Sequence, residues 1–169
     1  MDVLDAIRAR RSVRAYRDTP VPDEVLARVL EAARLAPSAR NRQEWRFIAV
    51  RDEATRRALA EAAKGQTWVA EAPVCLAFCA TEDQYVMSCG QKAGTVDVSA
   101  ALAYVTLAAA AEGLGTCWLG AFYEDRVKAI LGAPAGARVV GMTPLGYPAE
   151  NPPPRPRKPA GDVISFERW

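Results

Sequence analysis

Asp97 to Glu112 read DVSAALAYVTLAAAAE, and this stretch is apolar around almost the whole circumference of the helix that it predicts. Its only polar members are Asp97, Ser99, Thr106 and Glu112, and the many alanines allow close approach of a neighbouring element. A helix of this kind must be covered on all sides. Because one chain of 169 residues can do this only at its centre or with a partner, we expect a homodimer that shares this helix.

The overall composition is that of a globular chain, with 50% hydrophobic residues, 25% charged residues and a net charge of +2. These values fit one domain over residues 1–169. Prolines crowd the segment from about 148 to 169, so we expect an extended C-terminal arm that lies on another surface. The apolar run Val98–Ala111 is shorter than the roughly 20 residues of a membrane span, which predicts a buried helix and no membrane partner. The charged N-terminal residues favour a cytoplasmic location.

Hydrophobic spacing and turn residues predict the order of helices and strands. A first helix is capped by Asp2, turns Leu4 and Ile7 inward and extends to Arg11. Further helices are expected over 20–36, 52–64, 97–112 and 123–131, and strands over 46–50, 74–79 and 138–143.

The longest irregular stretch is the polar segment 81–95. Loops of this length are often lids or substrate contacts. Tyr85, Met87 and Cys89 are therefore candidates for the rim of a substrate pocket, with a plain surface loop as the alternative.

Several kinds of chemistry are excluded by what the chain lacks. There is no histidine, and Cys75, Cys79, Cys89 and Cys117 lack C-x-x-C spacing, so we expect no metal site and no Ser-His-Asp or Cys-His catalytic device. The glycine-rich stretch 113–120 follows a predicted helix and lacks the G-x-G-x-x-G spacing of a dinucleotide fold. The chemistry is therefore expected to come from a bound cofactor.

Two clusters of basic residues lie near the two ends of the chain. Arg10, Arg11, Ser12 and Arg14 form the first, and residues 155–158 form the second. Two basic clusters with one hydroxyl suit a dianionic phosphate. A nucleic-acid partner is not expected, because the net charge is only +2 and the second cluster lacks interleaved aromatic residues.

The loop over residues 37–43 gathers a hydroxyl, two side-chain amides and a run of backbone amides. These groups match the alternating donors and acceptors on the edge of a flat ring such as an isoalloxazine. The alternative is an ordinary connection between a helix and a strand.

The order of four motifs along the chain resembles the FMN-dependent nitroreductase family. They are Arg-Arg-Ser-x-Arg at 10–14, Ala-Pro-Ser-Ala-x-Asn-x-Gln-x-Trp at 36–45, Gly-Leu-Gly-Thr-Cys-Trp-Leu-Gly at 113–120, and Gly-Tyr-Pro followed by Arg-Pro-Arg-Lys within 146–158. The resemblance implies an α+β fold with a central mixed or antiparallel β-sheet surrounded by helices. It also implies an intertwined homodimer with two FMN sites at the subunit interface.

The resemblance further implies which residues hold FMN. The first basic cluster would meet the phosphate, the ribityl chain and the pyrimidine edge, and the second would close the phosphate site. Residues 37–41 would reach the ring from the other subunit, residues 119–121 would run along its opposite face, and Gln66 would reach the uracil edge. The full set is Arg10, Arg11, Ser12, Arg14, Pro37, Ser38, Ala39, Asn41, Gln66, Leu119, Gly120, Ala121, Arg155, Arg157 and Lys158.

Two residues depart from the family pattern. Glu44 stands where the family usually has proline, and Ala121 stands where a second glycine is common. Glu44 is either a solvated loop carboxylate or a group that lowers the affinity for an anionic nicotinamide phosphate.

The resulting expectation is an FMN-dependent oxidoreductase. It would take hydride from NADH or NADPH and pass electrons to a small organic acceptor, of nitroaromatic or quinone type, by a ping-pong mechanism. The alternatives are a specialised dehalogenase, aldehyde reductase or dehydrogenase of the same family, or a non-catalytic protein that stores flavin.

Overall fold

The central strand of the fold is β2 (Val74–Ala80), every residue of which is buried. In the computed structural model, which describes residues 1–169, β2 lies between β1 (Trp45–Val50) and β4 (Arg138–Gly146), and the two-residue β3 (Gly115–Thr116) completes the order β1-β2-β4-β3. All three pairings are antiparallel. A parallel bridge from Ser12 to Thr116 adds the N-terminal segment to this edge, so the sheet is mixed there.

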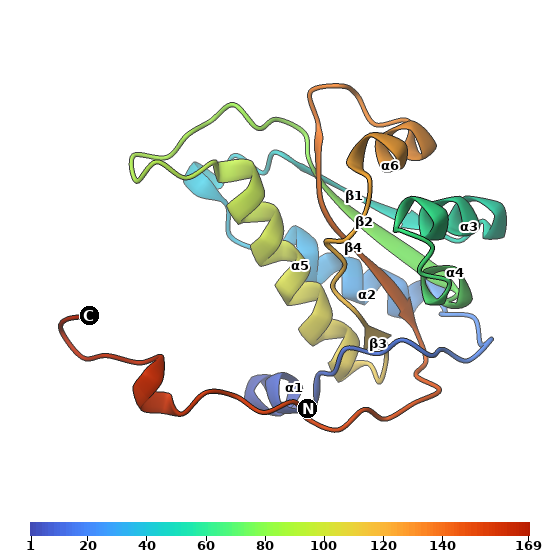
Figure 1. The fold of residues 1–169 in the computed structure, drawn as a ribbon, viewed down its shortest axis with the longest axis horizontal. Helices are drawn as coiled ribbons and strands as arrows, with labels where there is room; N and C mark the ends of the chain where they lie inside the picture. The colour runs from blue at the N-terminus through green and yellow to red at the C-terminus, as the bar shows by residue number, and fades with distance from the viewer.

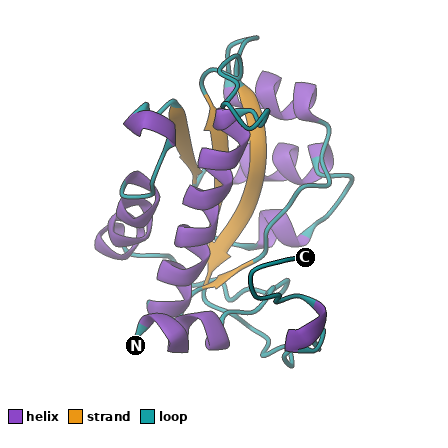
Figure 2. Cartoon of the chain, turned by 90° about the vertical axis from the view of Figure 1, so that its left-hand side faces the viewer, coloured by secondary structure: helices purple, strands orange, loops and turns teal.

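Helices cover both faces of the sheet (Figures 1 and 2). One face carries α2 (Asp23–Arg34) and α5 (Ala93–Ala111), and the other carries α3 (Glu53–Ala62), α4 (Trp68–Glu71) and α6 (Glu124–Leu131). Successive side chains of β2 point to opposite faces of the sheet and so contribute to two hydrophobic cores. Leu76 and Phe78 lie in the core under α2 and α5, whereas Cys75 and Ala77 lie in the core under α3, α4 and α6. The expected α+β fold is confirmed.

The long apolar helix lies at the centre of the first core. Val98, Leu102, Val105 and Ala109 of α5 are completely buried against α2 and the sheet. By length and composition α5 could cross a membrane, but 50% of its most apolar window is buried inside the molecule, as in the core helix of a folded domain. A single chain leaves one side of the helix open, where Tyr104 is 44% exposed.

Two details of the expected secondary structure were wrong. The first helix, α1 (Val3–Ala9), ends before Arg10 and Arg11, and its Leu4 and Ile7 are exposed because no other part of the chain covers them. The helix expected from residue 97 begins at Ala93, and the glycine at position 94 lets this first turn pack closely, since a Cβ there would lie 2.9 Å from the Cβ of Ala80. The unexpected α4 is a single turn before β2.

The rest of the chain after β4 runs as an extended arm with one short turn of 3-10 helix, Ala160–Asp162. Figure 1 shows this arm in orange and red, leading away from the body of the molecule. Phe166 is 88% exposed, and Trp169 at the end of the chain is fully exposed. Within the single chain, no other segment covers these two aromatic side chains.

Val105→Ala tests the packing of α5. The substitution removes two methyl groups from a fully buried position and leaves a cavity there. We therefore expect the free energy of unfolding in urea to fall by about 2–3 kcal/mol. Val163→Ala is the matched control, because Val163 is 63% exposed in the C-terminal arm and its loss should cost less than about 0.5 kcal/mol. Equal losses from the two variants would contradict this packing.

Candidate functional site

The two arginine clusters, which are far apart in the sequence, meet at one cavity of about 360 Å³. The bridge from Ser12 to Thr116 holds the first cluster against β3, with the backbone N–H of Val13 donating to the Thr116 carbonyl at 2.9 Å. The C-terminal arm passes alongside, where the N–H of Ala149 donates to the Ala15 carbonyl at 2.9 Å. The lining residues are Ile7, Arg8, Arg10, Arg11, Ser12, Arg14, Glu150, Pro152, Pro153, Pro154, Arg155 and Arg157.

Positive charge in this cavity is mostly uncompensated. Of its six arginines only Arg8 has an ion pair, with Asp5 at 3.6 Å. The one carboxylate, Glu150, accepts from the backbone N–H of Arg14 and pairs with no guanidinium group. Several free guanidinium groups around one small cavity are chemically suited to a dianion. Lys158 does not line the cavity, because the arm carries it past Arg157, so that part of the expected set is not brought together.

A second group of expected residues lies on the neighbouring loop after β3. Leu119 is fixed by a pair of backbone hydrogen bonds to Met142, at 2.8 and 3.1 Å. The side-chain amide of Gln66 donates to the carbonyls of Ala63 and Ala121, at 2.7 and 3.2 Å, which leaves its oxygen free to accept. The backbone N–H groups of Gly120 and Ala121 have no acceptor within the chain. This loop therefore offers donors and one acceptor to a ligand.

The loop of residues 37–43 carries strained backbone. Arg40, Asn41 and Gln43 all have positive φ angles, between 54° and 56°, which is unusual for residues with side chains. The loop is held by two contacts: the carboxylate of Asp97 accepts from the N–H of Ala39 at 3.1 Å with each oxygen, and the hydroxyl of Ser38 accepts from the N–H of Gln43 at 3.1 Å. Asn41 is exposed, and its side-chain amide makes no hydrogen bond within the chain. Strain of this kind is concentrated at functional sites.

The two halves of the expected site lie at opposite ends of α5 (Figure 1). Residues 37–43 are fixed to Asp97, in the second turn of the helix, whereas residues 10–14 are fixed to Thr116, just after its C-terminal end. At about 1.5 Å per residue, the 19-residue α5 is about 28 Å long. One chain therefore does not bring the two halves together.

Comparison with known proteins identifies the family of this chain. The model of the Nitroreductase family matches residues 7–80 and 63–147. The chain belongs to the nitroreductase family. It is 39% identical to a protein of Thermus thermophilus named NADH dehydrogenase, over 97% of each chain, and 33% identical to an FMN reductase [NAD(P)H] of Bacillus subtilis, over 99% of this chain and 74% of that one.

Solved structures agree with the family assignment. The NADPH:FMN oxidoreductase from Vibrio harveyi, solved in complex with NAD+, superposes with a TM-score of 0.90 at 28% identity, covering 99% of this chain and 77% of that chain. The nitroreductase fold expected from the sequence motifs is therefore confirmed.

The segment 81–92 of this nitroreductase chain is a hairpin-like loop, with a bridge between Val86 and Lys92. Buried Asp83 fixes its base through Lys92 Nζ at 2.9 Å and Arg138 Nη1 at 3.5 Å. Of the three residues expected at a pocket rim, Tyr85 packs beside the loop 37–43, where it meets Arg40 and Arg42. Met87 lies in the turn, and Cys89 is exposed at the tip.

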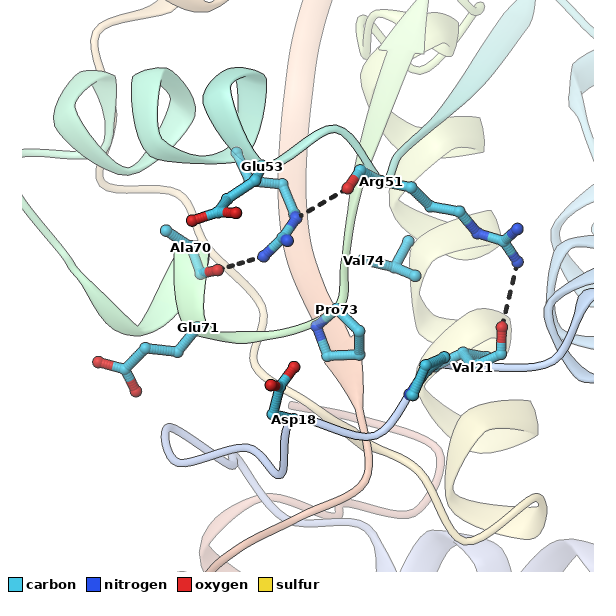
Figure 3. Close-up of a pocket in the computed structure, with 10 residues that line it drawn as sticks. Asp18, Val21, Arg51, Glu53, Ala70, Glu71, Pro73 and Val74 are labelled. Carbon is cyan, nitrogen blue, oxygen red and sulfur yellow. Dashed lines mark hydrogen bonds between the residues drawn. The ribbon is translucent and has the colours of Figure 1, made fainter.

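A larger cavity of about 500 Å³ lies elsewhere, between the segment after Tyr16 and the start of β2 (Figure 3). Its guanidinium groups are already engaged. Arg51 donates to the Val21 carbonyl at 3.1 Å and pairs with Asp23, and Arg56 donates to the carbonyls of Arg51, Ala70 and Ala72. Because no cation remains free there, this cavity does not compete as the anion site.

The structure adds residues that the motifs did not single out. Arg14 lies over the ring of Trp68, with its guanidinium carbon 5.6 Å from the ring centroid, which links the cavity to the Gln66 segment. The Tyr16 hydroxyl donates to the Val13 carbonyl at 2.6 Å, and burial raises the pKa of Tyr16 far above its usual value. Trp68 directly follows Gln66 and Thr67, and this proximity was the only signal in the sequence.

Three of the four cysteine thiols are buried. Burial raises the pKa of Cys75 to about 12 and that of Cys79 to about 11, so both remain protonated near neutral pH. Cys117 lies close to Arg14 and Ser12, but burial still raises its pKa. The expectation that the cysteines are mostly core residues is confirmed for these three, whereas Cys89 is exposed.

Proposed function

We propose that this chain is an FMN-dependent oxidoreductase that uses NADH or NADPH to reduce a small organic acceptor, of nitroaromatic or quinone type, by a ping-pong mechanism. The observation that carries the proposal is the convergence of arginines from both ends of the chain on one cavity, together with the unpaired backbone amides of residues 120 and 121 on the loop after β3. FMN would supply the redox chemistry, accepting a hydride from the nicotinamide and passing two electrons on. Four free thiols suit the reducing conditions of the cytoplasm, where we place the protein.

The residues present fit FMN in kind. Arg10, Arg14 and Arg157 would neutralise the phosphate, and Ser12 adds a hydroxyl donor; each charge-assisted hydrogen bond contributes roughly 1.5–3 kcal/mol. The free oxygen of Gln66 would accept from a ring N–H. The unpaired N–H groups of Gly120 and Ala121 would donate to a ring nitrogen or carbonyl.

The second half of the ring site would come from the partner subunit. We infer a two-fold dimer across α5, in which the loop 37–43 of one chain lies against the arginine cavity of the other. An apolar hollow of about 430 Å³ between α1, α2 and α5 supports this surface as the interface, because eight of its nine lining residues are hydrophobic. Val3, Leu4, Ile7 and Tyr104, exposed in the single chain, would be covered there.

Within this site the chain's own groups would hold and orient both partners of the reaction. The hydroxyl of Ser38 and the amide of Asn41 would fix the ring edge, and the strained loop between them is anchored by Asp97 before any ligand arrives. Such preorganisation reduces the cost of ordering the site when the ligand binds. Nicotinamide and acceptor would use the same ring face in turn.

The first test is the visible absorption spectrum of the purified protein, recorded without oxygen before and after addition of NADH or NADPH. We expect a flavin spectrum that bleaches on addition. A flavin that stays oxidised would favour a storage protein or another donor. Absence of flavin, even after incubation with FMN, would contradict the proposal.

The double variant Arg10→Ala/Arg157→Ala tests the phosphate site. Loss of two charge-assisted contacts should lower the affinity for FMN by at least about two orders of magnitude, measured by fluorescence titration. The dimer should persist, because the substitutions leave the apolar surface of α1, α2 and α5 that would hold the two chains together unchanged. Arg57→Ala is the control, since Arg57 is 73% exposed on α3 and pairs with Glu53. Unchanged FMN affinity in the double variant would remove the cavity from the cofactor site.

A mixed dimer tests whether each site uses two chains. One chain carries Arg10→Ala/Arg157→Ala, the other carries Ala39→Trp, and two affinity tags isolate the heterodimer. If sites are shared, one site combines the intact cavity of one chain with the intact loop of the other, so about half of the wild-type activity should return. Each homodimeric variant should be inactive. A heterodimer as inactive as its parents would contradict a shared site.

A further inference from the structure

The side chains of Arg40, Arg42 and Tyr85 form a compact cluster at the loop 37–43. The guanidinium carbons of Arg40 and Arg42 lie 5.6 and 4.8 Å from the centroid of the Tyr85 ring. These distances are typical of cation–π contacts. The cluster therefore joins the loop 37–43 to the loop 81–92 through one aromatic ring that meets two positive charges.

The two arginines differ in their acidic partners. Arg42 donates to both carboxylate oxygens of Glu44 and lies 3.4 Å from Glu82, so its charge is compensated within the loop. The same contact lowers the pKa of Glu44, which stays ionised beside its partner. Arg40 has no ion pair and donates no hydrogen bond from its guanidinium group to any atom of the chain, and it is exposed. Of the two arginines at Tyr85, Arg40 is therefore the one whose charge has no carboxylate partner.

Arg40 is held in a particular place despite its exposure. Its φ of 54° points the backbone into a region that residues with side chains rarely adopt, and its neighbour Ala39 is fixed to Asp97. A flexible surface arginine needs neither a strained backbone nor an aromatic support. The tyrosine restricts the guanidinium group without consuming any of its hydrogen-bond donors.

Arg40 is not needed to bind the cofactor phosphate, because the arginine-lined cavity proposed for that phosphate lies at the far end of α5. In the dimer that we infer, Arg40 would instead lie beside the ring half of the site, where donor and acceptor enter. An unpaired cation at that position attracts a second anion, different from the phosphate of FMN.

We propose that Arg40, supported by the ring of Tyr85, is a specificity-determining residue that binds an anionic group of the substrate. The proposal rests on the function proposed above and names the substrate class for the same site. The group is a phosphate or a carboxylate, which has two sources here. It is either the 2′-phosphate of NADPH, absent from NADH, or an acidic substituent on the aromatic acceptor.

Glu44 does not oppose this selection. The sequence left open that this carboxylate repels an anionic nicotinamide phosphate, but Arg42 and Glu44 form a bidentate pair. The pair has no net charge, and Glu82 also lies beside Arg42, so Arg40 is the guanidinium group of this loop that has no carboxylate partner.

The experiment compares wild type with Arg40→Gln in two arms. One arm measures kcat/KM for NADPH and for NADH with a quinone acceptor. The other measures kcat/KM for 4-nitrobenzoate and for neutral nitrobenzene at a saturating donor concentration. Loss of one charge-assisted contact should lower one of the two kcat/KM ratios, NADPH to NADH or 4-nitrobenzoate to nitrobenzene, about tenfold or more. The arm that changes identifies the source of the anion.

Two further variants complete the test. Arg40→Lys should keep part of the preference, because it retains the charge but not the planar donor group that stacks on Tyr85. Arg57→Gln removes an equal charge from α3 and should leave both ratios unchanged, which excludes an effect of net charge. Ratios that stay within about twofold in both arms for Arg40→Gln would overturn the proposal. A wild-type protein that holds no reducible flavin would instead overturn the proposed function.

Discussion

The burial of α5 constrains everything else in this structure. Val98, Leu102, Val105 and Ala109 are fully enclosed between α2 and the sheet, which fixes a helix about 28 Å long across the centre of the chain. The segments that carry polar chemistry are attached at its two ends, through Asp97 and through Thr116. A rigid helix keeps those segments apart in one chain. The separation of these two segments and the open apolar face are therefore two results of the same packing, and the dimer that we propose would account for both.

The charged side chains are distributed unevenly, and where they lie says more about the molecule than its net charge does. A net charge of +2 conceals a cavity with six arginines and one carboxylate. Several arginines elsewhere on the surface pair with nearby carboxylates, as Arg28 does with Glu112 and Arg138 with Glu124. Surface pairs of this kind contribute little to stability. Their effect here is to leave unpaired cations concentrated where an anionic ligand would bind.

The scaffold also supports a strained loop. Residues 40, 41 and 43 adopt left-handed backbone conformations, each of which has a cost for a residue with a side chain. The contacts of Asp97 with Ala39 and of Ser38 with Gln43 hold the loop in this conformation. Rigid elements on either side, α2 and β1, supply its ends. This combination of strain and anchoring fixes the Ser38 hydroxyl and the backbone of Asn41.

The sequence by itself determined the type and order of most elements, because hydrophobic spacing reports which face of a helix or strand is buried. The motif order also indicated the family and the residues of the two basic clusters. Tertiary structure alone decided that the clusters share one cavity, that Lys158 lies outside it, and that Leu4 and Ile7 are exposed. It also decided that Arg42 compensates Glu44 and leaves Arg40 unpaired. Periodicity encodes local burial, whereas these outcomes depend on distances between segments far apart in the chain, which only the packed fold sets.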